Sequence, residues 1–273
     1  MHSDQVSHGY ADTRYGQVHY ARAGPPNGST VLLLHQTPRS CDEFAELLPL
    51  LAAAGQHALA IDMLGFGLSA KPPGQQTIEQ YAAGALATLD TLGIGDVAVL
   101  GHHTGAVVAI EAGATAPARV RRLVLSSPPY TGADWRARHS DGPAVDDAAT
   151  AADGGHLTEL WRQRAPYYPA DRPDLLNRFI RDCLAPGVDP REGHLACARY
   201  QMEHRIGHVT ADVLIVGAAA DPFAMPGLEP VRRALVGAGS VTTHVIDGGM
   251  IPLMEHKADE VAALTLAFLA DHP

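Results

Sequence analysis

The most distinctive stretch of the sequence is a pair of histidines between two glycines, Gly-His-His-Thr-Gly at residues 101–105. An apolar run precedes it, and a run rich in alanine and valine follows it. This order predicts a strand, a tight turn and a helix, the arrangement that presents a nucleophile on a sharp turn above a sheet. His103 occupies the nucleophile position. Because imidazole exchanges its proton near neutral pH, His103 is a candidate for acid–base chemistry.

Other polar residues follow other predicted strands. His35 and Gln36 come after the apolar run at residues 30–34, and Asp221 follows the run that begins at residue 212. The carboxyl ends of parallel strands open onto one edge of a sheet, where ligands of such sheets bind. We therefore expect these side chains to share one rim with His103.

The elements that must position these residues alternate between strands and helices. We predict strands at residues 30–34, 57–61, 97–100, 122–126, 212–216 and 241–246, and helices at residues 44–54, 78–92, 106–116, 227–235 and 258–270. A hairpin at residues 10–23 precedes them. Apolar strands of this kind are typical of a sheet buried on both faces. The predicted fold class is α/β, with a mostly parallel sheet flanked by helices.

Residues 130–207 interrupt this alternation. They are rich in alanine, aspartate, arginine and proline, and they hold helical stretches but no clear strand. The segment is too long for a structureless loop. We predict a helical cap insertion at residues 130–207, on a core formed by residues 1–129 and 208–273. Tyr130, where the cap begins, is a candidate substrate contact.

Composition narrows the function classes. The 273 residues suit one large domain, and the formal net charge of −10 argues against nucleic acid or an anionic membrane as a partner. We see no signal peptide and no membrane span, and the three dispersed cysteines favour a reducing, cytoplasmic setting. No local metal-ligand motif or phosphate-binding glycine loop appears, so we expect no metal and no cofactor. The expected partner is a small-molecule substrate, and a homodimer is left open.

The motifs together resemble the α/β-hydrolase superfamily, in particular its cap-bearing branch. Residues 35–36 resemble the family's His-Gly oxyanion loop, 62–69 its D-x-x-G-x-G-x-S segment, 101–105 its G-H-S-x-G elbow, 217–222 the loop of the triad acid, and 247–252 the G-G-H loop of the triad histidine. The resemblance covers nearly the whole chain. It implies a capped α/β-hydrolase fold with Asp221 as the triad acid.

Two of the three triad positions depart from that pattern. His103 replaces the nucleophile, and Met250 replaces the catalytic histidine. A thioether cannot accept the proton that serine hydrolysis requires a base to take. We hypothesise a direct pair of His103 and Asp221, with Met250 as an apolar wall against the ring. The resemblance further suggests an oxyanion hole from the N–H groups of Gln36 and Thr104. The side chain of Gln36 either projects into the pocket as an amide donor or hydrogen-bonds its own loop.

The predicted activity is that of an atypical hydrolase acting on a small carbonyl compound, such as an ester, a lactone or a ketone-like molecule. His103 and Asp221 would supply the acid–base chemistry, while His35 either braces its loop or contacts substrate. Three alternatives stay open. His103 can serve as the base of a lyase, cyclase or decarboxylase, it can be a covalent nucleophile, or the chain can be a ligand-binding domain without activity.

Overall fold

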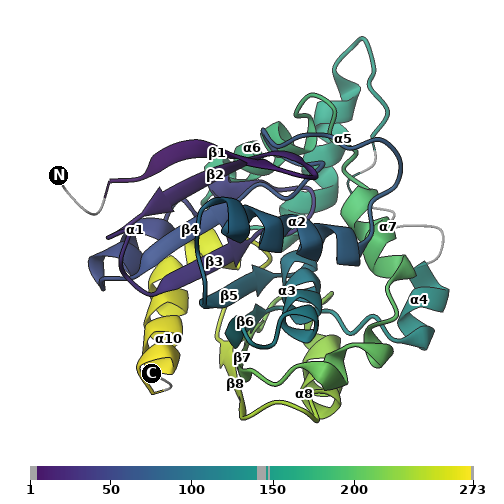
Figure 1. Ribbon diagram of the computed structural model, residues 1–273. Coiled ribbons are helices and arrows are strands. Elements are labelled where there is room, and N and C mark those ends of the chain that lie inside the picture. Colours follow the sequence, from purple (N-terminus) through teal and green to yellow (C-terminus); the bar gives the residue numbers. More distant parts are fainter. Residues whose placement is uncertain (1–4, 140–145, 147, 272–273) are drawn as a thin grey trace.

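A computed structural model shows one eight-stranded sheet between helices (Figure 1). It describes residues 5–139, 146 and 148–271. The strands are β1 (Ser7–Thr13), β2 (Gly16–Ala23), β3 (Thr30–Leu34), β4 (His57–Ile61), β5 (Val97–His102), β6 (Val120–Ser126), β7 (Asp212–Ala218) and β8 (Val241–Ile246). Their order is β1-β2-β4-β3-β5-β6-β7-β8, and the six strands from β4 to β8 in this order pair in parallel. The predicted α/β class with a mostly parallel sheet is confirmed.

Helices cover both faces of this sheet. The α-helices are α1 (Leu47–Ala53), α2 (Ile78–Thr91), α3 (Thr104–Thr115), α4 (Ala133–His139), α5 (Gly155–Arg164), α6 (Pro173–Cys183), α7 (Glu192–Arg199), α8 (Leu228–Ala234), α9 (Leu253–His256) and α10 (Ala258–Asp271). Short 3₁₀ helices are η1 (Cys41–Phe44), η2 (Ala165–Tyr167), η3 (Met202–His204), η4 (Ile206–His208) and η5 (Met225–Gly227). The helix predicted at residues 44–54 corresponds to α1, and η1 precedes it and ends at Phe44.

Strand alternation divides the core into two apolar clusters. Leu32 and Leu34 of β3 belong to the cluster under α2 and α3, whereas Val31 and Leu33 belong to the cluster under α1 and α10. Successive side chains of a strand point to opposite faces, so a strand buried on both faces is apolar at every position. Each fully buried aliphatic side chain contributes roughly 1.5–3 kcal/mol.

The edge strand β8 departs from the expected pattern of apolar, buried strands. Residues 242–245 are exposed, because β8 has only β7 beside it. Polar side chains at an edge discourage pairing with another sheet. The candidate site residues Gln36, His103 and Asp221 lie on loops that follow the interior strands β3, β5 and β7.

The helical segment at residues 130–207 holds α4 to α7, and no strand occurs among its described residues. Figure 1 shows α5 and α6 at the top of the molecule and α4 and α7 at its right. Among the helices that the structure describes, none is long and apolar enough to cross a membrane. The three cysteines lie buried in the described part as thiols.

Candidate functional site

A strained turn between β5 and α3 presents His103. Its backbone has φ 48° and ψ −113°, a conformation that side-chain-bearing residues rarely adopt. The flanking glycines are required by close packing: a Cβ on Gly101 would lie 2.1 Å from the carbonyl oxygen of Gly105, and one on Gly105 would lie 2.0 Å from that of Leu34. The sequence Gly-His-His-Thr-Gly therefore forms the predicted elbow. Strain of this kind is held by surrounding structure and clusters at functional sites.

The ring of His103 meets the carboxylate of Asp221 directly. His103 Nε2 and Asp221 Oδ2 are 2.8 Å apart, with Asp221 fully buried and the His103 side chain 15% exposed. The ring N–H is not aligned well enough for a hydrogen bond, so neither atom has one within the described part of the chain. The His103 ring thus reaches the Asp221 carboxylate without an intervening side chain.

Asp221 is fixed from its other oxygen. Oδ1 accepts hydrogen bonds from the backbone N–H groups of Phe223, at 3.0 Å, and Ala224, at 3.3 Å. Burial alone would raise the pKa of Asp221, but the neighbouring His103 and these N–H groups lower it to about 2. Asp221 is therefore a carboxylate at neutral pH. It both stabilises the turn after β7 and faces His103.

His102 braces the site from below. Its Nε2 donates to the carbonyl oxygen of Ile251 at 2.9 Å, and its Nδ1 lies 2.9 Å from the hydroxyl of Ser126. Burial lowers the pKa of His102 to about 3, and the adjacent His103 acts in the same direction. A neutral ring with a donor at Nε2 must accept from Ser126 at Nδ1. His102 thus ties the loop after β8 to the end of β6.

The structure corrects the role predicted for Gln36. Its backbone N–H donates to Glu43 Oε2 at 2.8 Å, and its side-chain amide lies 2.6 Å from Glu43 Oε1. An N–H that already serves a buried carboxyl group is not available to an oxyanion. Gln36 is 3% exposed, so its side chain belongs to the loop rather than to an open pocket.

Two other backbone N–H groups remain. Thr104 begins α3, where first-turn N–H groups lack partners within the helix. Thr37 follows Gln36, and the described residues include no recorded acceptor for its N–H. These two amides lie on the loops after β5 and β3, which meet where Gly105 packs on Leu34.

His35 does not reach a ligand. It is fully buried, its Nδ1 donates to the carbonyl oxygen of Gln36 at 2.8 Å, and its Nε2 accepts from the N–H of Met63 at 2.9 Å. Burial lowers its pKa, so the ring is neutral. Of its two predicted roles, substrate contact is wrong and bracing of the loop agrees with the geometry.

Met250 and Tyr130 are both partly buried. The N–H of Met250 donates to His256 Nε2 at 3.0 Å, and Tyr130 packs against the apolar cluster under α2 and α3. Among the described residues, no hydrogen bond or ring contact joins either side chain to His103. Their predicted roles as pocket wall and substrate contact stay predictions.

The structure contains a buried ionic network, centred on Arg39, that the sequence did not predict. Arg39 is fully buried, and it donates to Asp182 of α6 at 2.9 Å and to Glu255 of α9 at 2.7 Å. The network joins the helical segment to the core. Glu255, on the short helix α9, balances the charge of Arg39. Nothing in the local sequence signals this pairing.

Glu43 is the other unexpected group. It is fully buried, and burial raises its pKa to about 8, although Arg39 opposes the shift. Glu43 is therefore predominantly a neutral acid at pH 7. Turning the Gln36 amide over leaves its shape unchanged and lets the Glu43 O–H donate to it.

The family model for the alpha/beta hydrolase fold matches residues 29–189, more than half of the chain. The chain belongs to the α/β-hydrolase fold family. The predicted superfamily is thereby confirmed, and within this hydrolase fold His103 lies on the elbow between β5 and α3.

Relatives of this α/β hydrolase include a haloalkane dehalogenase from Psychrobacter cryohalolentis, 25% identical over 94% of this chain and 88% of that protein. The bifunctional epoxide hydrolase 2 of Mus musculus is 35% identical, but the match covers 46% of this chain and only 23% of that protein. Among solved structures, epoxide hydrolase A from Mycobacterium thermoresistibile has a TM-score of 0.79 at 22% identity, covering 97% and 98% of the two chains. The enol-lactonase from Burkholderia xenovorans has a TM-score of 0.76 at 21% identity, covering 96% and 100%. The last two likenesses show the fold.

Proposed function

We propose that this α/β hydrolase adds water to a small carbonyl compound, such as an ester or a lactone, through His103 and Asp221. The observation that carries the proposal is the 2.8 Å contact between His103 Nε2 and the buried Asp221 carboxylate. It supplies a base and its orienting acid in a site without the usual histidine. Relatives bearing the names haloalkane dehalogenase and epoxide hydrolase support hydrolytic chemistry.

The two ring nitrogens take different roles in this proposal. Asp221, charged at neutral pH, holds Nε2, which leaves Nδ1 to remove a proton from water. The imidazolium that forms is stabilised by the same carboxylate and then passes its proton to the leaving oxygen. Catalytic contacts are often misaligned before substrate binds, so the present Nε2–Oδ2 geometry is compatible with this role.

The developing oxyanion needs donors other than Gln36. We place the N–H groups of Thr37 and Thr104 in that role, because each lies on a loop beside the elbow and neither has a recorded acceptor among the described residues. Removing one such donor costs roughly 10²–10³ in turnover in enzymes of this kind. Nothing in this scheme requires a covalent nucleophile.

The experiment is a substrate panel followed by variants. Small esters, lactones, enol lactones, epoxides and haloalkanes are incubated with the full chain, and products are identified by NMR. For each compound that reacts, we expect His103→Gln to lower kcat/KM by roughly 10²–10⁴, the usual contribution of a general base. His244→Gln, at an exposed position on β8, is the matched control and should retain full activity.

Four results would contradict the proposal. Full activity in His103→Gln would show that His103 is not the general base. An acylated His103 detected by mass spectrometry would show that His103 acts as a nucleophile instead. Binding without turnover across the panel would favour the ligand-binding alternative. Elimination or decarboxylation products would favour the lyase alternative.

A further inference from the structure

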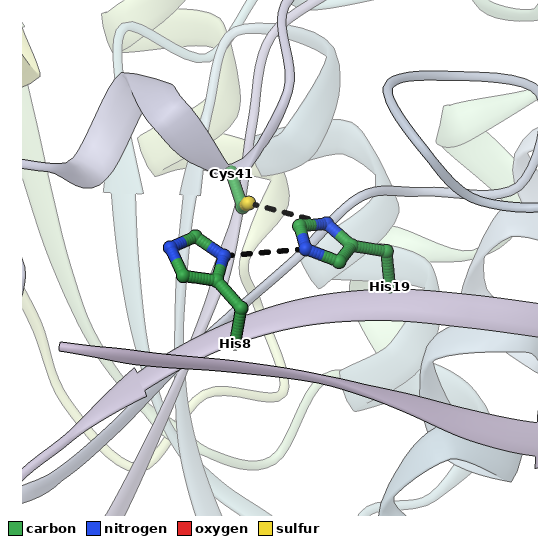
Figure 2. A group of neighbouring side chains, drawn as sticks. All are labelled: His8, His19 and Cys41. Carbon is green, nitrogen blue, oxygen red and sulfur yellow. Dashed lines mark hydrogen bonds between the residues drawn. The ribbon is translucent and has the colours of Figure 1, made fainter.

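Three potential metal ligands meet at a place that the proposed chemistry does not use. His8 lies on the edge strand β1, His19 on β2, and Cys41 begins η1. One ligand atom from each lies within 4.8 Å of the others. Figure 2 shows the thiol reaching from η1 toward two rings that rise from the paired strands. Three elements contribute one ligand each, so no local spacing motif could reveal the group.

The separation of the two imidazoles suits a tetrahedral ion. His8 Nδ1 and His19 Nε2 are 3.2 Å apart. Zinc binds histidine nitrogen at about 2.0–2.1 Å, which places two tetrahedral nitrogen ligands roughly 3.3–3.4 Å apart. The rings lie nearly parallel, 11° between planes, and face each other as a hydrogen-bonded pair. Because His8 is exposed, its ring can turn so that both lone pairs converge on an ion.

Asp62 orients two of the three ligands. Its Oδ2 accepts from His19 Nδ1 at 2.9 Å, and its Oδ1 accepts from the backbone N–H of Cys41 at 2.7 Å. A carboxylate only accepts hydrogen bonds, so the His19 proton is on Nδ1 and the lone pair is on Nε2. Metal-binding histidines almost always donate their second ring nitrogen in this way. The position and tautomer of His19 are therefore set before any ion arrives.

The cluster of His8, His19 and Cys41 is open to solvent only on the side of His8. His19 and Cys41 are buried, whereas His8 lies at the surface. An ion can enter past His8, and a water molecule can complete four-fold coordination from the same side. Cys41 Sγ lies 3.8 Å from His19 Nδ1, so the thiol is already packed against the ring that it would share an ion with.

We propose that His8, His19 and Cys41 form a binding site for a zinc ion. Two imidazole nitrogens and a sulfur are ligands that zinc favours, and solvent supplies the fourth. Cys41 binds as thiolate and releases its proton to water. The two charges of the ion then balance that thiolate and the Asp62 carboxylate beside it.

The ion would pin the β1–β2 hairpin to η1. Glu43 lies in η1 and holds Gln36 in the loop below the elbow. Zinc would therefore stabilise the support of the candidate site without touching His103. Binding to the folded state alone raises stability by RT ln(1 + [L]/Kd), roughly 2.7 kcal/mol when the free ion is at 100 times its Kd.

The test is a zinc titration of the full chain after treatment with a chelator. A chromophoric competitor reports the free ion, and we expect one zinc per chain with a Kd at or below about 1 μM, near −8 kcal/mol. His8→Gln and Cys41→Ser should each weaken binding at least tenfold, while His244→Gln should leave it unchanged. Cobalt(II) should give a thiolate-to-metal charge-transfer band in the unmodified chain and none in Cys41→Ser.

Because His8 is exposed on an edge strand, His8→Gln tests the site even if Cys41→Ser fails to fold. Thermal unfolding gives a second readout, with saturating zinc raising the Tm of the unmodified chain but not that of His8→Gln. The proposal is overturned if the unmodified chain binds no stoichiometric zinc. It is equally overturned if His8→Gln binds as tightly as His244→Gln, or if cobalt shows no thiolate band.

Discussion

Replacing Glu43 by glutamine should change how stability depends on pH. Glu43 has a pKa of about 8 in the folded protein, against 4.5 for an unburied glutamate. The folded state therefore holds a proton that the unfolded state has lost throughout the interval between these values. Stability from this group is complete below about pH 4.5 and is lost as the pH rises through about 8. Glutamine cannot ionise, so Glu43→Gln removes this loss.

The magnitude follows from proton linkage. One proton bound by the folded state alone costs roughly 1.4 kcal/mol per pH unit. Between pH 5.5 and 7.5 the unfolding free energy of Glu43→Gln should therefore gain roughly 2–3 kcal/mol relative to the unmodified chain. Glutamine preserves the shape of the contact with Gln36, so the backbone N–H keeps an acceptor.

Urea unfolding at both pH values measures this difference, with the denaturant dependence checked for a constant slope. Glu79→Gln, an exposed site in the first turn of α2, serves as the matched control. Its difference from the unmodified chain should not vary with pH. A Glu43→Gln difference that stays constant within about 0.5 kcal/mol, well inside the linkage value, would refute a neutral Glu43.

Three further perturbations follow from the site's packing and charges. Asp221→Asn should make the stability less dependent on pH in acid. Asp221 stabilises the fold above about pH 3.8 and loses that effect as the pH falls to about 2, so urea unfolding should show a deficit of the variant at neutral pH that shrinks over that interval. Arg39→Leu leaves Asp182 and Glu255 without their buried cation. Calorimetry should show that the free energy of unfolding falls by roughly 3–5 kcal/mol, and a fall below about 1 kcal/mol would contradict a stabilising role of the network. Gly105→Ala forces a Cβ to within 2.0 Å of a β3 carbonyl, so unfolding free energy should fall by roughly 1–3 kcal/mol or more, and an unchanged value would contradict the elbow's geometry.

The fold and the central pair were predictable because their signals are local or ordered along the chain. Apolar runs mark β3 to β7, and the glycines around His103 mark a tight elbow. Parallel strands then bring Asp221, in the loop after β7, to the same edge as His103. The structure supplied the distance and the misaligned geometry.

Long-range contacts were not predictable. Arg39 meets Asp182 across 143 residues and Glu255 across 216 residues, and no periodicity encodes such pairings. The role given to Gln36 was wrong because a carboxyl group seven residues away, on Glu43, takes its N–H. Asp42, Glu43 and Glu46 lie close together in the sequence, and nothing there singles out Glu43 as the buried acid.

The same reason explains the histidines on the hairpin. His8 and His19 face one another only through the β1–β2 register, in which His8 pairs with Ala21 and Tyr10 with His19. Cys41 joins them from η1. Fifteen scattered histidines in the sequence did not single out these two.

In the proposed mechanism His103 and Asp221 act as one catalytic unit, and a double-mutant cycle measures their coupling. On whichever carbonyl substrate the panel identifies, kcat/KM is measured for the unmodified chain, His103→Gln, Asp221→Asn and the double variant. We predict that each single change costs at least roughly 10², and that the double variant is no slower than His103→Gln, because groups acting as a unit are not additive. Losses that multiply, or a His103→Gln variant as active as the unmodified chain, would contradict it.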